Sequence, residues 1–250
     1  MSLQYIFARP DYVDKAGDIF PIRLIDYEAF EQCSSILYIS KNHFKKNPYP
    51  LLFLIFMSAE HLGFKNEREL IKEFEKLFSL VARKDFKFVE SDDNAWFECE
   101  YEEDGVVKKN YINVDNYDAV RTTITKQNLL FEQKIYKTER TRRWAEKALK
   151  TKQKKAPKIT LEDIVTTVSV SCGKNYSDLQ YYTIYQLYSD FYRLRKIAEY
   201  DASVHFLCAG AKDLKLQDFA ESLDLYHNPY DDLFVDSSKL SGLNKVMQGK

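Results

Sequence analysis

The chain has 250 residues, of which 45% are hydrophobic and 30% are charged, and its formal net charge at pH 7 is -1. This composition is typical of a folded globular protein and excludes a disordered chain. The balanced charge excludes a global field that would attract nucleic acid or an anionic membrane. Only 7 glycines and 6 prolines occur, which favours helices and a few defined strands over a loop-rich architecture.

Four cysteines are present, and they form no CxxC pair: Cys33, Cys99, Cys172 and Cys208. Their scatter, together with an N-terminus that lacks the pattern of a signal peptide, predicts buried thiols in a reducing compartment. The strongest apolar run, Leu51–Ala59, is shorter than the ~20 residues that a membrane span needs. We therefore expect a cytoplasmic protein without a membrane segment.

The first residues predict a hairpin followed by a helix. Apolar and polar residues alternate on both sides of residues 10–18, which pairs Tyr5–Ala8 with Ile19–Leu24. Asp26 has the residue type of a helix N-cap, and apolar residues recur behind it at helical spacing as far as Leu37. We expect β-structure first and a helix second in this part of the chain.

Two further helices are predicted before residue 85. The apolar run after two prolines predicts a buried helix over Leu51–Leu62, which Gly63 ends. Asn66 should cap an amphipathic helix that ends at Ala82. Four residues at helical spacing make the apolar face of that helix. They are Leu70, Phe74, Leu77 and Phe78.

Residues 85–114 predict a three-stranded antiparallel meander. Side chains alternate between apolar and polar in Asp85–Glu90, Ala95–Glu102 and Val107–Val114. Asp104-Gly105 between two of these runs is a strong hairpin signal, because both residues adopt the positive φ angles of a type I′ turn. Asp115 is then expected to cap a helix that ends near residue 130.

Three alternating carboxylates in the meander allow two interpretations. Glu98, Glu100 and Glu102 share one face of the predicted strand and could form the cluster of a metal-dependent nuclease. Their alternation is also typical of the solvated face of an edge hairpin. Lys108 and Lys109 on the next strand can neutralise them, so we expect a solvated face.

The segment 137–158 holds ten lysines and arginines against two glutamates. We expect a basic helix and linker that separates residues 1–136, with the hairpin, helices and meander, from a C-terminal helical domain at 159–250. The segment is also the alternative nucleic-acid-binding site of the chain. Its candidate residues are Arg142, Arg143, Lys150, Lys152, Lys154 and Lys155.

The C-terminal part predicts three helices. Thr160 begins the first with a capping box, and Gly173 ends it. A long helix follows over residues 177–209, with start signals at both Ser177 and Thr183. A last amphipathic helix is expected at Asp213–Leu223. The whole chain is therefore predicted to be α+β and predominantly α-helical, with a small antiparallel three-stranded meander and an N-terminal hairpin.

Two further groups of residues allow both a functional and a structural interpretation. The first helix of this part, a turn and the long helix match helix-turn-helix superficially, but the mixed charges on the long helix would not approach phosphates readily. His205 and Cys208, even with Cys172, fall short of the four ligands of a structural zinc site. We expect no metal, no cofactor and no catalytic residues, and hence a protein that is not an enzyme.

The long helix carries a strip of tyrosines beside its predicted core stripe. The core stripe is Ile184, Leu187, Phe191, Leu194 and Ala198, and the strip is Tyr181, Tyr185, Tyr188 and Tyr192. Such a strip is ordinary at the boundary of a core. Tyrosine is also enriched at protein–protein contacts, so the strip is the candidate partner-binding surface.

Two segments carry a resemblance to a family. Tyr182–Tyr188 (YTIYQLY), which follows residues 159–173 and precedes Phe191–Leu194 (FYRL), resembles the C-terminal region of helical proteins of phages and prophages from low-GC Gram-positive bacteria. Those proteins are encoded among the tail genes, and several are tail-assembly chaperones for the tape-measure protein. Ile19–Phe30 (IFPIRLIDYEAF) resembles their usual opening.

The resemblance implies a non-enzymatic chaperone in the host cell cytoplasm that keeps the tape-measure protein soluble during tail assembly. Helix-in-groove contacts would be the mode of binding. Two alternatives stay open. The chain could be a tail or connector subunit of the virion that associates with copies of itself, or a nucleic-acid-binding regulator that uses residues 137–158.

Overall fold

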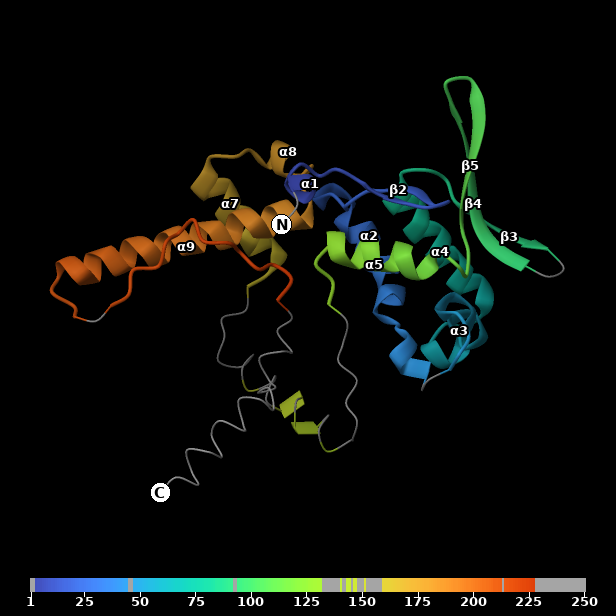
Figure 1. Cartoon of the computed structure of the whole chain (residues 1–250), viewed down its shortest axis with the longest axis horizontal. Helices are drawn as coiled ribbons and strands as arrows, with labels where there is room; N and C mark the ends of the chain where they lie inside the picture. The colour runs from blue at the N-terminus through green and yellow to red at the C-terminus, as the bar shows by residue number, and fades with distance from the viewer. Residues whose placement is uncertain are drawn as a thin grey trace. The chain divides into compact units, whose positions relative to one another are not determined.

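The computed structural model describes residues 3–44, 47–91, 94–131, 159–212 and 214–227, together with Arg140, Arg143, Trp144, Glu146, Lys147 and Thr151. Met1–Leu130 and Thr160–Leu225 form one compact unit, and Phe131–Ile159 with Tyr226–Lys250 form another. The first unit is drawn in colour over most of Figure 1 and contains all the elements discussed below.

The N-terminal hairpin is present, but its strands differ from the predicted ones. Strand β1 (Asp11–Val13) pairs antiparallel with β2 (Gly17–Ile19), so the turn lies inside the segment predicted to join the strands. Residues 5–8 were predicted as a strand and instead belong to helix α1 (Leu3–Ile6) and the turn behind it. Gly17 has φ 81°, which lets the chain reverse within these few residues.

Helices make up most of the chain between the hairpin and the meander. The structure contains the following elements: η1 (Leu24–Asp26), α2 (Tyr27–Cys33), η2 (Ser34–Tyr38), η3 (Lys41–Phe44), α3 (Leu51–Met57), η4 (Glu60–Leu62) and α4 (Glu67–Ala82). Asp26 occupies the predicted N-cap position of α2, although its side chain makes no cap hydrogen bond. The helix predicted over 51–62 is shorter, because Ser58 ends α3 and a 3-10 turn follows.

Helix α4 forms as predicted. The Asn66 side chain accepts a hydrogen bond from the Glu69 amide at 2.9 Å, which satisfies an amide that lacks a partner within the helix. Gly63, with φ 95°, ends the preceding turn. The four predicted apolar-face residues of α4 are all fully buried.

The meander is confirmed. Strands β3 (Lys87–Ser91), β4 (Asn94–Glu103) and β5 (Val106–Ile112) pair antiparallel in the order β3-β4-β5. Asp104 and Gly105 have φ 55° and 74°, which are the angles of the predicted tight turn. In Figure 1 the outer part of the β4–β5 hairpin extends beyond β3.

The two faces of β4 differ as expected. Phe97 and Cys99 are buried, whereas Glu100 and Glu102 are exposed and Glu98 is half-buried. Lys109 forms an ion pair with Glu100 across the strands. Among the described residues, no group of three or more His, Cys, Asp or Glu side chains could hold a metal ion.

Helix α5 (Tyr117–Gln127) begins later than predicted. Its N-cap is Asn116 and not Asp115. The Asn116 side chain donates to the carbonyls of Asp14 and Tyr111 at 3.1 and 2.9 Å, so it ties the helix start to the hairpin and the meander. The contact with Asp14 joins residues 102 positions apart, which the local pattern does not contain.

Aromatic rings fill the core between α4, the meander and α5. Phe74 has four rings within 6 Å of its own, measured between centroids: Phe56, Phe78, Phe97 and Tyr117. Tilted and edge contacts between buried rings add to the free energy gained by removing their area from water. This cluster is the centre of the larger core.

The C-terminal part of the unit is built from α7 (Leu161–Cys172), α8 (Tyr176–Leu179) and α9 (Ile184–Cys208). Thr160 and Asp163 form the predicted capping box of α7, and Gly173, with φ 63°, ends that helix. A second and smaller core lies between α7, α8 and the first turns of α9. Its members are Ile164, Val168, Leu179, Leu187 and Phe191.

Two predictions in this region were wrong. The long helix does not begin at Ser177, which lies in the single turn of α8. The segment 213–223 was predicted as a helix, but residues 214–223 are not helical. The fold class is confirmed as α+β and mainly helical. None of the helices in the described residues is long and apolar enough to cross a membrane.

Candidate partner-binding site on the long helix

The two segments that carry the family resemblance lie against each other. Arg23 and Thr183 form an isolated antiparallel bridge. The Leu24 amide donates to the Tyr182 carbonyl at 2.8 Å, and the Ile25 amide donates to the Gln180 carbonyl at 2.9 Å. The N-terminal segment therefore fixes the start of α9, and residues on both sides of 137–158 are joined in one unit. The exact division at residues 136 and 158 stays a prediction.

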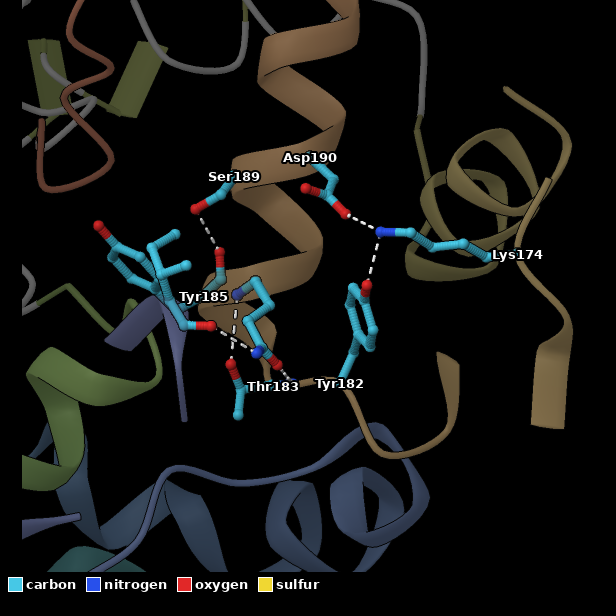
Figure 2. A network of polar contacts seen from close by, with 8 residues as sticks. Lys174, Tyr182, Thr183, Tyr185, Ser189 and Asp190 are labelled. Carbon is cyan, nitrogen blue, oxygen red and sulfur yellow. Dashed lines mark hydrogen bonds and ion pairs between the residues drawn. The ribbon is translucent and has the colours of Figure 1, made fainter. Parts of the chain in front are cut away.

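A capping box starts α9 at Thr183. The Thr183 hydroxyl accepts from the Gln186 amide at 3.2 Å, and the Gln186 side chain accepts from the Thr183 amide at 2.8 Å. The Gln186 side chain also donates to the Ile6 carbonyl at 2.7 Å. Figure 2 shows these contacts around the first turn of the helix. Of the two start signals in the sequence, the second is the one used.

Lys174, which follows α7, contacts residues before and within the first turns of α9. The Lys174 ammonium donates to the Tyr182 hydroxyl at 2.5 Å and to the Asp190 carboxylate at 2.8 Å (Figure 2). Burial lowers the pKa of Lys174, but the hydrogen bonds to Asp190 and Tyr182 outweigh it and leave the pKa above its ordinary value. This constellation is a charged anchor between the end of α7 and α9, with the lysine in its protonated form.

The tyrosine strip is divided by the structure. Tyr185 is 1% exposed and its ring lies 5.5 Å from that of Tyr5, so it is a core residue and not a surface contact. Tyr188 is half-buried, and burial raises its pKa. Tyr192 is 38% exposed, and Tyr181, which precedes α9, is 56% exposed. A role in partner binding stays a prediction for the last three.

The predicted core stripe also ends earlier than expected. Ile184, Leu187 and Phe191 are buried, but Leu194 is half-buried and Ala198 is exposed. Residues 192–208 are all described, and each of them is half-buried or exposed. In Figure 1 this second half of α9 extends beyond α7. The burial of α9 side chains therefore ends about halfway along the helix.

The second half of α9 carries an apolar line of its own, which we call the outer stripe. It consists of Ile197, Tyr200, Val204 and Leu207. These residues are spaced by three, four and three positions, which is the spacing of a helix that pairs with another helix. All four are half-buried or exposed. The sequence gives only a weak signal for this stripe, because the tyrosines are the more prominent pattern on the helix.

An extended segment returns along α9, and we call it the strap. It comprises Leu214–Leu225 and includes the described residues 214–223 of the helix predicted at Asp213–Leu223. Arg193 donates to the carbonyls of Phe219 and Glu221, the latter at 2.9 Å. The Lys196 ammonium lies 3.2 Å from the Glu221 carboxylate, and the rings of Tyr200 and Phe219 are 5.3 Å apart. The strap therefore covers part of the outer stripe.

The remaining candidate residues form no metal-binding group in the part of the chain that the structure describes. His205, Cys208 and Cys172 are exposed. Arg143 is helical and its side chain is exposed. The other nucleic-acid candidates lie outside the described residues: Arg142, Lys150, Lys152, Lys154 and Lys155.

Comparisons with known proteins point to a prophage. Residues 151–224 match the family model of the YomV second domain, and this range contains α7, α8, α9 and all but the last residue of the strap. The chain is 26% identical over 115 residues to the SPbeta prophage-derived uncharacterized protein YomV of Bacillus subtilis (strain 168). The alignment covers 46% of this chain and 48% of YomV, so the chain spans about half of that relative. No solved structure matches the chain.

The prophage-encoded relative supports the expected phage or prophage origin. The names of the relative and of the family state no role in tail assembly, so the chaperone function is not shown by the comparisons. The family match covers α7, α8, α9 and nearly all of the strap. The candidate site therefore lies in the part of the chain that has known relatives.

Proposed function

We propose that this chain is a prophage-encoded, non-enzymatic tail-assembly chaperone that binds the tape-measure protein through the outer stripe of α9. The observation that carries the proposal is that Phe191 is the last buried residue of α9. The following residues continue as regular helix with apolar side chains at pairing spacing. Support for the phage setting comes from the prophage-encoded relative.

The difference in burial between the two halves of α9 is the physical reason to expect a partner. Isolated helices are marginal in water, so most helices depend on packing of an apolar face. The first turns of α9 have that packing, from the second core and from Tyr185 against Tyr5. The outer stripe would gain it from a partner helix. An elongated helical protein with exposed apolar residues is a partner of this kind, and helix-in-groove contacts bury such residues on both sides.

The proposal is tested by co-expression of the chain with the neighbouring phage genes and mass spectrometry of what co-purifies. We expect an elongated tail protein to co-purify with the wild type. With the double variant Ile197→Ser/Leu207→Ser, we expect at least a tenfold loss, since two apolar anchors worth roughly 1–2 kcal/mol each are removed. Both residues are partly exposed, so the circular dichroism of the variant should be unchanged.

Val170→Ser is the matched control. Val170 is 81% exposed and lies on α7, outside the outer stripe, so its replacement should leave co-purification unchanged. Equal loss in both variants would mean that general apolar adhesion, and not the stripe, retains the partner. Recovery of the chain only with copies of itself, as rings or filaments, would favour a structural subunit of the virion and overturn the chaperone proposal.

A further inference from the structure

We propose that the strap is the chain's own ligand for the face of α9 formed by Arg193, Lys196 and Tyr200. The partner, beside the helix that packs on the outer stripe, displaces the strap with an extended segment carrying an aromatic residue and, two positions later, an acidic residue. The inference rests on the proposed function and adds to it the chemistry of the partner segment and a means of regulation. The contacts between α9 and the strap are the evidence for it.

Three side chains of α9 recognise three different features of the strap. Arg193 binds two backbone carbonyls, Lys196 binds the Glu221 carboxylate, and Tyr200 packs edge-on against the Phe219 ring. Positions 193, 196 and 200 lie on one face of the helix, because they are three and four residues apart. Backbone, carboxylate and ring are thus recognised in a fixed order along one helix face.

The strap is shaped so that both of its recognition side chains reach α9. The Asp218 carboxylate accepts a hydrogen bond from the Ala220 amide at 2.8 Å, and the Asp218 carbonyl accepts from the Glu221 amide at 3.1 Å. This turn separates Phe219 from Glu221 by one residue and lets both face the helix. A ligand with an aromatic residue, any residue and an acidic residue in a similar turn can make the same contacts.

Charge favours an acidic ligand. The helix supplies Arg193 and Lys196, whereas the strap holds three acidic residues (Asp218, Glu221 and Asp224) against one lysine, Lys215. The two arginine contacts go to main-chain carbonyls, which every peptide has. The Phe219 ring and the Glu221 carboxylate therefore determine specificity. A segment with an aromatic and an acidic side chain can replace both.

The strap is held weakly enough to be displaced. Leu214, Leu216 and Phe219 remain 41–43% exposed although they lie in the strap. The ion pair of Lys196 with Glu221 is also partly exposed, and such pairs contribute little in water. Segments with few buried contacts open at low free energy. Only Leu225 at the end of the strap is buried.

Tethering explains why the strap still occupies its site. The loop after Cys208 is short, so the strap is present at high effective concentration near α9. An external segment must compete with it, and its apparent affinity is reduced by the fraction of chains in which the strap is closed. The strap thus keeps the basic and apolar face covered until a partner with better contacts is present.

The test uses the full chain, labelled with ¹⁵N, and a synthetic peptide with the sequence of residues 214–225. In the double variant Phe219→Ala/Glu221→Ala, whose own strap is weakened, we expect the peptide to shift the amide signals of residues 193–200. Its apparent dissociation constant should be at least about tenfold lower than in the wild type, where the closed strap competes.

Two further variants in that background show whether α9 is the site. Arg193→Ala should weaken peptide binding by about tenfold or more, since two hydrogen bonds from a charged donor are lost. Arg195→Ala is the matched control, because Arg195 pairs with Glu199 on α9 and not with the strap. A peptide with alanine in place of its Phe and Glu should bind neither protein.

Equal affinity for the wild type and the strap variant, shifts outside residues 193–200, or no shifts at millimolar peptide would overturn the inference. The measurement needs no tail protein, so it fails or succeeds separately from the proposed function. If the peptide does not bind while a tail protein still co-purifies, the strap is a fixed part of the fold. If the peptide binds while no tail protein co-purifies, the strap inference stands and the chaperone proposal fails.

Discussion

Replacement of Tyr185 by alanine is expected to lower the free energy of unfolding by about 3 kcal/mol, in the range for large-to-small changes in a core. Tyr185 is 1% exposed, and its ring packs on that of Tyr5 between α9 and α1. The truncation leaves a cavity where the N-terminus meets the long helix. Urea unfolding followed by circular dichroism should show a lower midpoint with an unchanged m value.

Tyr181→Ala is the matched control for this prediction. Tyr181 belongs to the same predicted strip but is 56% exposed, and surface substitutions usually change stability by less than about 0.5 kcal/mol. If both variants unfolded at the wild-type midpoint, Tyr185 would not belong to the core and the strip could act as one surface. A large effect at Tyr185 alone separates the core tyrosine from the exposed ones.

Phe74→Ala is expected to be the most damaging single change, at about 4 kcal/mol. Phe74 is fully buried at the centre of the aromatic cluster, with the ring of Phe78 at 5.4 Å and that of Phe97 at 5.5 Å. Since whole domains are stable by only about 5–15 kcal/mol, the variant should be near its unfolding threshold. Near-ultraviolet circular dichroism and the urea midpoint measure the loss.

Phe53→Ala provides the comparison within the same half of the chain. Phe53 lies on α3 and is 41% exposed, and its ring is tilted against that of Tyr49 at 5.3 Å. Its removal should cost less than half as much as the removal of Phe74. Similar losses at both positions would contradict the assignment of the core centre to the cluster around Phe74.

Features that depend on a few neighbouring residues could be predicted from the sequence. The caps at Asn66, Thr160 and Thr183 each join residues three positions apart, and the turn at Asp104-Gly105 depends on two residues alone. The meander followed from the period of its side chains. Local hydrogen bonds and hydrophobic periodicity determined these elements, so inspection of short windows was sufficient.

Features that depend on distant contacts could not be predicted in this way. Residues near Tyr5 alternate like a strand, but Tyr5 is held in a helix by contacts with Asp11 and Tyr185. The amphipathic pattern of 213–223 resembles a helix, but the segment gains its contacts by lying along Arg193 and Tyr200 instead. Tertiary contacts of this kind override local propensity.

The candidate site was predicted only in part. The sequence indicated the long helix as the candidate binding element and placed its start at Ser177 or Thr183, and α9 starts at Thr183. The predicted binding surface was the tyrosine strip, because tyrosine is enriched at protein–protein contacts. Where the core ends along α9 depends on the length of α7 packed beside it, which a single helix pattern does not contain.

The most direct test of the central claim is hydrogen exchange of the chain alone and in its co-purified complex. If the outer stripe binds the partner, amides of residues 194–208 should become slower to exchange in the complex by at least about tenfold, because packing suppresses local opening of the helix. The strap should become faster, since it leaves α9. Protection confined to the meander or to α3, with α9 and the strap unchanged, would contradict the account.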